Sequence, residues 1–125
     1  MSKDIFINLI DVISNEAKYH LKESNEFYPF AYVLKNGTLV STNVYSGIEK
    51  PDVQLHLVDI EKALTKYQTY AIGINSSFKD SISGAEIDII EIRITVDKES
   101  YKHCAIPYEI MNDGNIKIYD LFELE

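Results

Sequence analysis

Hydrophobic and polar positions recur along this chain with two different periods, and each change of period marks a new element. From residue 4 to 22, apolar side chains recur about every four positions, which is the spacing of one face of an α-helix. They are Ile5, Leu9, Ile13, Ala17 and Leu21. A second series runs from about residue 51 to 67 and has Pro51 in its first turn, where proline is tolerated. The pattern therefore predicts two amphipathic helices.

A hairpin signal lies between the two helical series. Asn36 and Gly37 both tolerate the positive φ that a two-residue hairpin loop requires. Pairing the strands across this loop gives two unequal faces. The large face carries Phe30, Tyr32, Leu34, Leu39, Ser41, Asn43 and Tyr45, and the small face carries Ala31, Val33, Val40, Thr42 and Val44. We expect the small face to pack against the helices, and the large face to be either core or a contact surface.

The period of two returns after the second helical series. Residues 76–85 are rich in serine and predict a loop. In the isoleucine-rich strand that follows, the alternation changes phase between Ile89 and Ile90, which indicates a β-bulge or burial on both faces. The extended segments expected in this half of the chain are Tyr70–Asn75, Ile87–Val96, Tyr101–Tyr108 and Ile116–Phe122.

The order of elements predicts a single α+β domain over residues 1–125, namely helix, two strands, helix, three strands and a short terminal strand. Sequential hairpins predict an antiparallel sheet of five to six strands, with the two helices on one face. This order resembles the profilin-like and roadblock-like folds, in which a hairpin, a crossing helix and a three-stranded meander form one sheet. Folds of that kind host scaffolds, sensors and binding modules alike.

Residues Phe27 to Gly37 also carry a family resemblance. Tyr28, Pro29 and Phe30, followed by strand residues and a hairpin glycine, resemble the Tyr-Pro-Phe motif that follows an N-terminal helix in a group of small uncharacterised bacterial proteins. The similarity continues through most of the chain, at Tyr45, in the helix after Pro51, in residues 70–75 and in residues 105–108. Members of this group look like single acidic domains of the accessory or immunity type. The resemblance implies no catalytic residue.

Charge and composition narrow the possible partners. Twelve Lys and Arg against twenty Asp and Glu give a net charge of -8, so the phosphates of nucleic acid would be repelled and a basic protein partner fits better. Acidity also serves solubility alone. No apolar run approaches the roughly 18 residues that span a bilayer, so we expect no membrane partner and a cytoplasmic location. Cys104 is the single cysteine, which excludes an internal disulfide.

Residue types with catalytic or metal-binding chemistry are scattered. His103 and Cys104 are neighbours on a predicted strand and therefore point to opposite faces, so they do not form a nucleophile and base pair. His20 and His56 have no second ligand at helical spacing. We therefore expect no catalytic, cofactor-binding or metal site. Glu86 and Asp88 share a strand face and are the only candidates for acid and base chemistry, although a solvated face is the commoner case.

The candidate functional surface is one for a partner protein. It comprises Phe30, Tyr32, Tyr45, Tyr70, Glu86, Asp88, Asp97 and Glu99. The first hypothesis is an interaction protein, such as an immunity protein that neutralises a basic toxin through an acidic, tyrosine-rich surface. The second is a small-molecule binding or sensing module, and the third is an enzyme that uses the acidic pair. A homodimer is compatible with all three, because it would cover an exposed edge or aromatic face.

Overall fold

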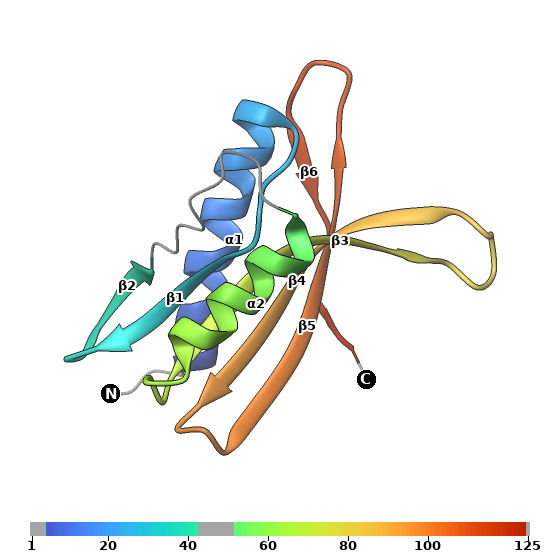
Figure 1. Cartoon of the computed structure of the whole chain (residues 1–125). Helices are drawn as coiled ribbons and strands as arrows, with labels where there is room; N and C mark the ends of the chain where they lie inside the picture. The colour runs from blue at the N-terminus through green and yellow to red at the C-terminus, as the bar shows by residue number, and fades with distance from the viewer. Residues whose placement is uncertain (1–4, 43–51, 125) are drawn as a thin grey trace.

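The computed structural model describes residues 5–42 and 52–124, and Figure 1 shows two helices and a twisted antiparallel sheet. The order of the elements agrees with the sequence prediction, except that the single terminal strand expected over residues 116–122 is divided into two short strands, which gives a seven-stranded sheet over the described residues. The elements are α1 (Ile5–Ser24), β1 (Phe30–Lys35), β2 (Thr38–Thr42), α2 (Val53–Leu64), β3 (Tyr70–Lys79), β4 (Glu86–Val96), β5 (Ser100–Ile110), β6 (Ile116–Ile118) and β7 (Phe122–Glu123). The strand order is β2-β1-β3-β4-β5-β6, and β7 pairs with β5.

Local signals in the sequence explain where the helices begin and end. The carboxylate of Asp52 caps α2 by accepting hydrogen bonds from the backbone N–H groups of Gln54 and Leu55. Asn25 ends α1 in a left-handed conformation with φ of 65°, and its N–H donates to the carbonyl of Leu21 at 2.8 Å. Helix α2 ends at Leu64, three residues before the predicted end, and Pro51 lies outside the described residues.

The first hairpin has the predicted register. Leu34 pairs with Leu39 and Val33 with Val40 across a loop in which Asn36 and Gly37 have φ of 54° and 81°. These two residues adopt the left-handed conformation that the loop requires. The two-residue hairpin prediction is therefore confirmed.

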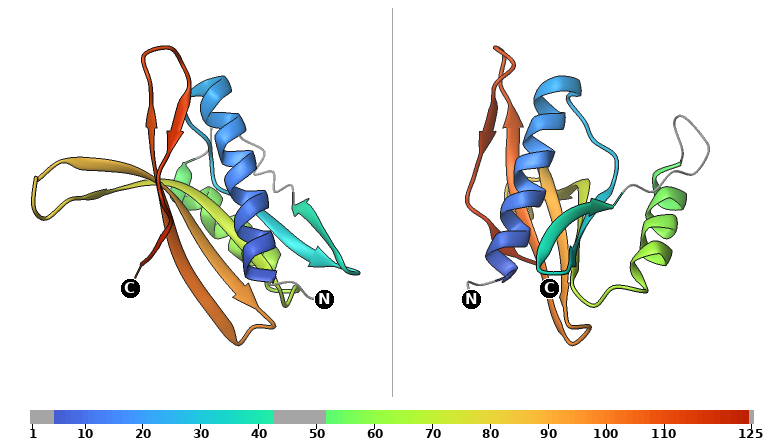
Figure 2. Two further views of the ribbon diagram at one scale, coloured as in Figure 1. Left: turned by 180° about the vertical axis from the view of Figure 1, so that it is seen from behind. Right: turned by 90° about the vertical axis from the view of Figure 1, so that its left-hand side faces the viewer.

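The two helices lie on opposite faces of the sheet, and the prediction that both cover one face was wrong. The buried side chains of α1 pack with Ala71 of β3, whereas those of α2 pack with Ile72 of the same strand. Adjacent strand residues point to opposite faces, so the sheet lies between the helices, as the right-hand view of Figure 2 shows. The reason is that both the odd-numbered and the even-numbered residues of β1 and β3 include apolar side chains, so both faces of the sheet are apolar and each needs a covering helix.

Strand β4 is buried on both faces over its middle, and this resolves the change of phase. Ile89, Ile90 and Ile92 are almost fully buried, and the register with β3 is continuous from Tyr70 opposite Thr95 to Lys79 opposite Glu86. The same register shows that residues 76–79 belong to β3, so the loop prediction was wrong for that part. Serine is tolerated there because pairing with the isoleucine-rich β4 supplies the backbone hydrogen bonds.

Two hairpins extend beyond the point where β4 and β5 stop pairing. The hydrophobic clusters of the helices include no residue from 76–88, whereas α1 packs with Tyr108, Ile116 and Ile118 of the other hairpin. We call residues 76–88 of the β3–β4 hairpin the first arm, and residues 108–118 of the β5–β6 hairpin the second arm. Figures 1 and 2 show that the arms diverge in different directions from a common point. Their divergence positions the candidate site.

Candidate binding cleft

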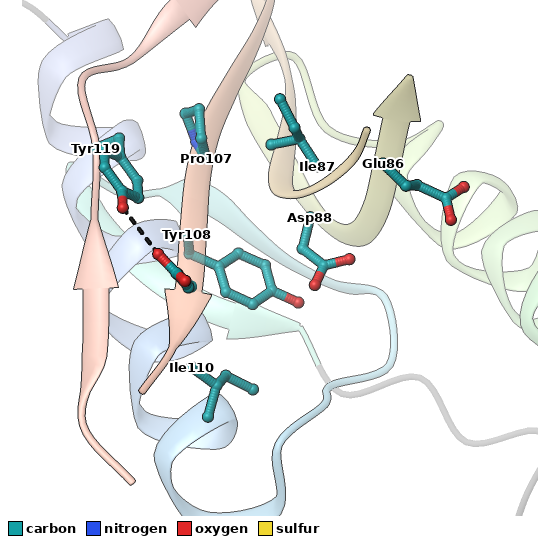
Figure 3. A pocket seen from close by; sticks show the side chains of 8 residues that line it. Glu86, Ile87, Asp88, Pro107, Tyr108, Ile110 and Tyr119 are labelled. Atoms are coloured by element: carbon teal, nitrogen blue, oxygen red, sulfur yellow. Dashed lines mark hydrogen bonds between the residues drawn. The ribbon is translucent and has the colours of Figure 1, made fainter. Parts of the chain in front are cut away.

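A cleft of about 630 Å³ lies between the bases of the two arms. Figure 3 shows the ring of Tyr108 on β5 directed toward Asp88 on β4, with Tyr119 on the other side of β5 and Glu86 pointing outward. The lining residues are Glu86, Ile87, Asp88, Pro107, Tyr108, Glu109, Ile110 and Tyr119. The volume is within the range of ordinary ligand sites, about 300–1,000 Å³.

The cleft exists because β5 changes its partners at Pro107. Pairing between β4 and β5 ends at Ile89 opposite Pro107, and beyond that point β5 pairs only with β6. The carbonyl of Pro107 accepts a hydrogen bond from the N–H of Tyr119 at 2.9 Å, which directs the chain after β6 along the second arm. On its outer edge, β5 pairs with β7 before Pro107 and with β6 after it. Pro107 has no N–H to donate, but its backbone faces this outer edge, so the pairing of β5 with β4 loses no hydrogen bond there.

The charged residues that line the cleft are all acidic. Glu86, Asp88 and Glu109 are exposed at its rim, and none of the eight lining residues is Lys or Arg. Two hydroxyl groups fix two of these carboxylates, because Tyr119 donates to Glu109 at 2.9 Å and Ser77 donates to Glu86 at 3.4 Å. Lysines lie next to the lining residues, since Lys79 is opposite Glu86, Lys117 is opposite Glu109, and Nζ of Lys117 lies 5.2 Å from the ring centroid of Tyr119. Asp88 has no lysine opposite it in these strand pairs, because Ser77 is its partner on β3.

The floor of the cleft is a buried tyrosine. Tyr108 is 6% exposed and donates its hydroxyl hydrogen to the side-chain carbonyl of Asn75 at 2.8 Å. Burial, together with the negative charge of Asp88, raises the pKa of Tyr108 to about 12. The phenol is consequently neutral at physiological pH, and with Ile87 and Ile110 it gives the acidic cleft an apolar interior.

The aromatic residues predicted as a surface divide between the two faces of the sheet. Phe30 and Tyr32 pack against the cluster that includes α1, so a covering layer is present and these rings are partly buried. Tyr32 donates to Glu16 of α1 at 2.6 Å, and this hydrogen bond, together with burial, raises the pKa of Tyr32 to about 12. Tyr70 lies beside the α2 cluster on the other face, and Tyr45 lies outside the described residues.

The predicted acidic residues also separate. Asp97 lies in the turn between β4 and β5, where its N–H donates to Thr69 at 3.2 Å, and Glu99 lies in the same turn. Glu86 and Asp88 are at the other end of β4. Of the predicted surface, the structure therefore brings only Glu86 and Asp88 together in the cleft. Sequence reasoning missed Tyr108, Glu109, Ile110 and Tyr119, although the extended segments predicted at Tyr101–Tyr108 and Ile116–Phe122 are close enough in sequence to pair as a hairpin.

A second polar cluster lies on the sheet face that α2 partly covers. Glu91 is 8% exposed, and its Oε2 lies 2.6 Å from Nε2 of His103 and 3.0 Å from Nε of Arg93. Arg93 also reaches Glu61 of α2 at 3.7 Å. Burial disfavours the charged form of Glu91, but the hydrogen bonds with His103 and Arg93 outweigh burial and hold its pKa below the usual value. The cluster thus joins α2 to β4 and β5.

The other candidate for chemistry is a packing residue. Cys104 is fully buried on the face opposite His103, as the alternation predicted, and burial raises the pKa of its thiol. Among residues 5–42 and 52–124, no group of three or more His, Cys, Asp and Glu side chains is arranged to hold a metal ion. Within the same ranges, neither helix has the length and apolar character needed to cross a membrane.

Fold and site together define the class of this protein: it is an α+β protein with a cleft lined by acidic and apolar residues between two β-hairpin arms. Comparison of the chain with protein-family models, with curated proteins and with solved structures found no match.

Proposed function

We propose that this protein is a protein-binding accessory protein, and that the cleft between its arms receives a basic segment of the partner. The observation that carries the proposal is the cleft itself, in which three carboxylates surround an apolar, tyrosine-lined floor and no Lys or Arg is among the lining residues. Complementary charge speeds the encounter of two proteins, and buried aromatic contacts anchor the complex.

A more specific role follows from the resemblance of the Phe27–Gly37 segment to immunity-type bacterial proteins. We propose that the partner is a basic toxin of the same cytoplasm, which this protein neutralises by occupying a basic surface. The net charge of -8 supports the choice of a basic partner. If a basic toxin is encoded beside the gene for this protein, co-expression of the two is expected to restore growth of cells that make the toxin, and neutralising Glu86 and Asp88 is expected to weaken that protection.

Site-specific crosslinking in the native cell tests the binding function. A photoreactive phenylalanine analogue replaces Tyr119 at the cleft, and in a matched variant it replaces Tyr101, which is 63% exposed at the opposite end of β5. We expect a basic protein to be crosslinked from position 119 and not from position 101. The purified partner is then expected to bind more weakly to the Glu86→Gln, Asp88→Asn double variant, most clearly at low salt.

Two results would contradict this proposal. One is crosslinking of the same protein from both positions, which indicates contact without use of the cleft. The other is unchanged affinity after Glu86 and Asp88 are neutralised. A cleft of about 630 Å³ also has the size of a small-molecule site, so a sensing module is the second candidate. A metabolite that raises the melting temperature of the parent protein, but not of a Tyr108→Ala variant, would favour that second function.

A further inference from the structure

The main chain of the second arm presents hydrogen-bonding groups to the cleft. On the side facing β6, the carbonyl of Pro107 accepts from Tyr119, and the N–H of Met111 donates to Asn115 at 2.8 Å. Backbone groups of successive strand residues alternate in direction, so residues 107, 109 and 111 face β6. The N–H and C=O groups of Tyr108 and Ile110 therefore point the other way, into the cleft.

The first arm presents a matching edge. The N–H of Asp80 donates to the carbonyl of Ala85 at 2.8 Å, so Ala85 and, by alternation, Ile87 direct their backbone groups toward β3. Those of Glu86 and Asp88 point away from β3. Because the pairing of β4 with β5 ends at Ile89 opposite Pro107, these groups also face the cleft without a strand opposite them.

We propose that an extended basic segment of the partner adds as a strand to the edge of β5 at Tyr108 and Ile110. This inference rests on the proposed binding function and specifies its mode. Strand addition gives affinity through the main chain, while alternate side chains give specificity. Lys or Arg side chains of the added strand meet Glu86 and Asp88 on one face of the sheet and Glu109 on the other.

Charge selects a basic partner over a second copy of this chain. Antiparallel pairing of two copies through residues 108–110 would bring their Glu109 side chains together, and both molecules carry a net charge of -8. Like charges opposite one another destabilise a strand pair. The same carboxylates stabilise an incoming strand with positive side chains. They therefore prevent the open edge from pairing with a second copy and also recognise the basic partner.

Backbone-modified peptides separate strand addition from attraction by charge alone. The probe is a short synthetic peptide in which Lys and Val alternate, so that as a strand it presents all its Lys side chains on one face, that of Glu86 and Asp88. Its comparison peptide has the same sequence with N-methylated amides along one edge. We expect the parent peptide to bind about tenfold more tightly than the methylated one, since each lost hydrogen bond is worth about 1 kcal/mol. Amide exchange at Tyr108 and Ile110 is expected to slow when the parent peptide binds.

Substitution of Ile110 provides the matching test in the protein. Ile110→Pro removes a cleft-facing N–H without changing charge or the hydrogen bonds that Glu109 makes to β6, and Ile110→Val retains the N–H. The proline variant is expected to lose about fivefold in affinity for the Lys–Val peptide, while the valine variant changes little. If the proline variant fails to fold, the methylated peptide measures the same main-chain contribution on the unmodified protein.

The possible failures are distinguishable. Equal binding of the two peptides, with loss of binding when Glu86 and Asp88 are neutralised, would overturn strand addition and leave the basic-partner function standing. Absence of binding by either peptide would also overturn the inference, while crosslinking from Tyr119 continues to test the function. Concentration-dependent dimerisation that protects the Ile110 amide without peptide would assign the edge to a second copy instead.

Discussion

Replacing Gly73 by alanine should destabilise the protein, because the core of the α1 face has no room for a side chain there. A Cβ atom built at Gly73 would lie 2.8 Å from Cγ2 of Ile13 and 3.0 and 3.1 Å from Cζ and Cε1 of Phe30. All three distances are shorter than ordinary carbon contacts of about 3.5–4.0 Å. The absence of a side chain at Gly73 thus allows both Ile13 of α1 and the ring of Phe30 to pack closely against β3.

Two opposing contributions set the size of the effect. Overpacking a well-filled core costs about 1–3 kcal/mol. Alanine also restricts the unfolded chain, which stabilises the folded state by about 0.4–1 kcal/mol where the native backbone accepts it. The φ of Gly73 is not in the positive range, so this second contribution applies. We expect a net loss of about 1–2 kcal/mol in the free energy of unfolding.

Urea denaturation of a double-mutant cycle measures this contact. Phe30→Leu removes Cζ and Cε1, so we expect Gly73→Ala to cost less in that background, with a coupling of about 0.5 kcal/mol or more. Ile13→Ala should also relieve the strain, whereas Ile13→Val keeps a branched methyl near the contact and should relieve it little. A Gly73→Ala protein as stable as the parent, or a cost independent of Phe30 and Ile13, would refute the reasoning.

Three further predictions concern ionisation and burial. The lowered pKa of Glu91 adds stability above its unfolded pKa of about 4.3 and loses it as pH falls through the lower folded value. The stability difference between the parent and Glu91→Gln should therefore shrink with acidification in urea titrations at several pH values, and a constant difference would contradict this. Ultraviolet titration of the nine tyrosines should show late ionisation near pH 12 from Tyr32 and Tyr108, reduced by one group in each Tyr→Phe variant. Cys104 should react with a thiol reagent only as fast as the protein opens, so rapid labelling of the native protein would be inconsistent with its complete burial.

The local parts of the fold were predictable because their signals are short-range. Helical periodicity identified the buried stripe of α1, and the Asn36–Gly37 pair fixed the register of β1 and β2. The side of the sheet that each helix covers was not predictable in the same way. It depends on the path of the chain between elements, and strands with apolar residues at both odd and even positions accept a helix on either face.

The candidate site was predictable only in part, for a related reason. Glu86 and Asp88 were recognised as a pair on one strand face, but the residues opposite them lie at least 19 positions later in the chain, since Pro107 follows Asp88 by 107 − 88 = 19. The cleft depends on where the pairing of β4 and β5 ends, and that point is at Pro107. A proline is compatible with the outer edge of a strand as well as with its end, so its presence did not locate the divergence.

The error at residues 76–79 and the position of the cleft have one cause. Ser76 and Ser77 predicted a loop because they lack the apolar alternation of a half-buried strand, yet they continue β3 into the first arm. That alternation is absent because neither helix covers this part of the sheet (Figure 2). Where a polar strand extends beyond the helix that covers it, its backbone hydrogen bonds to the neighbouring strand continue, but both of its faces and one edge remain accessible. The polar composition that made this arm look like a loop in the sequence therefore also leaves open the edge at which we propose that a partner binds.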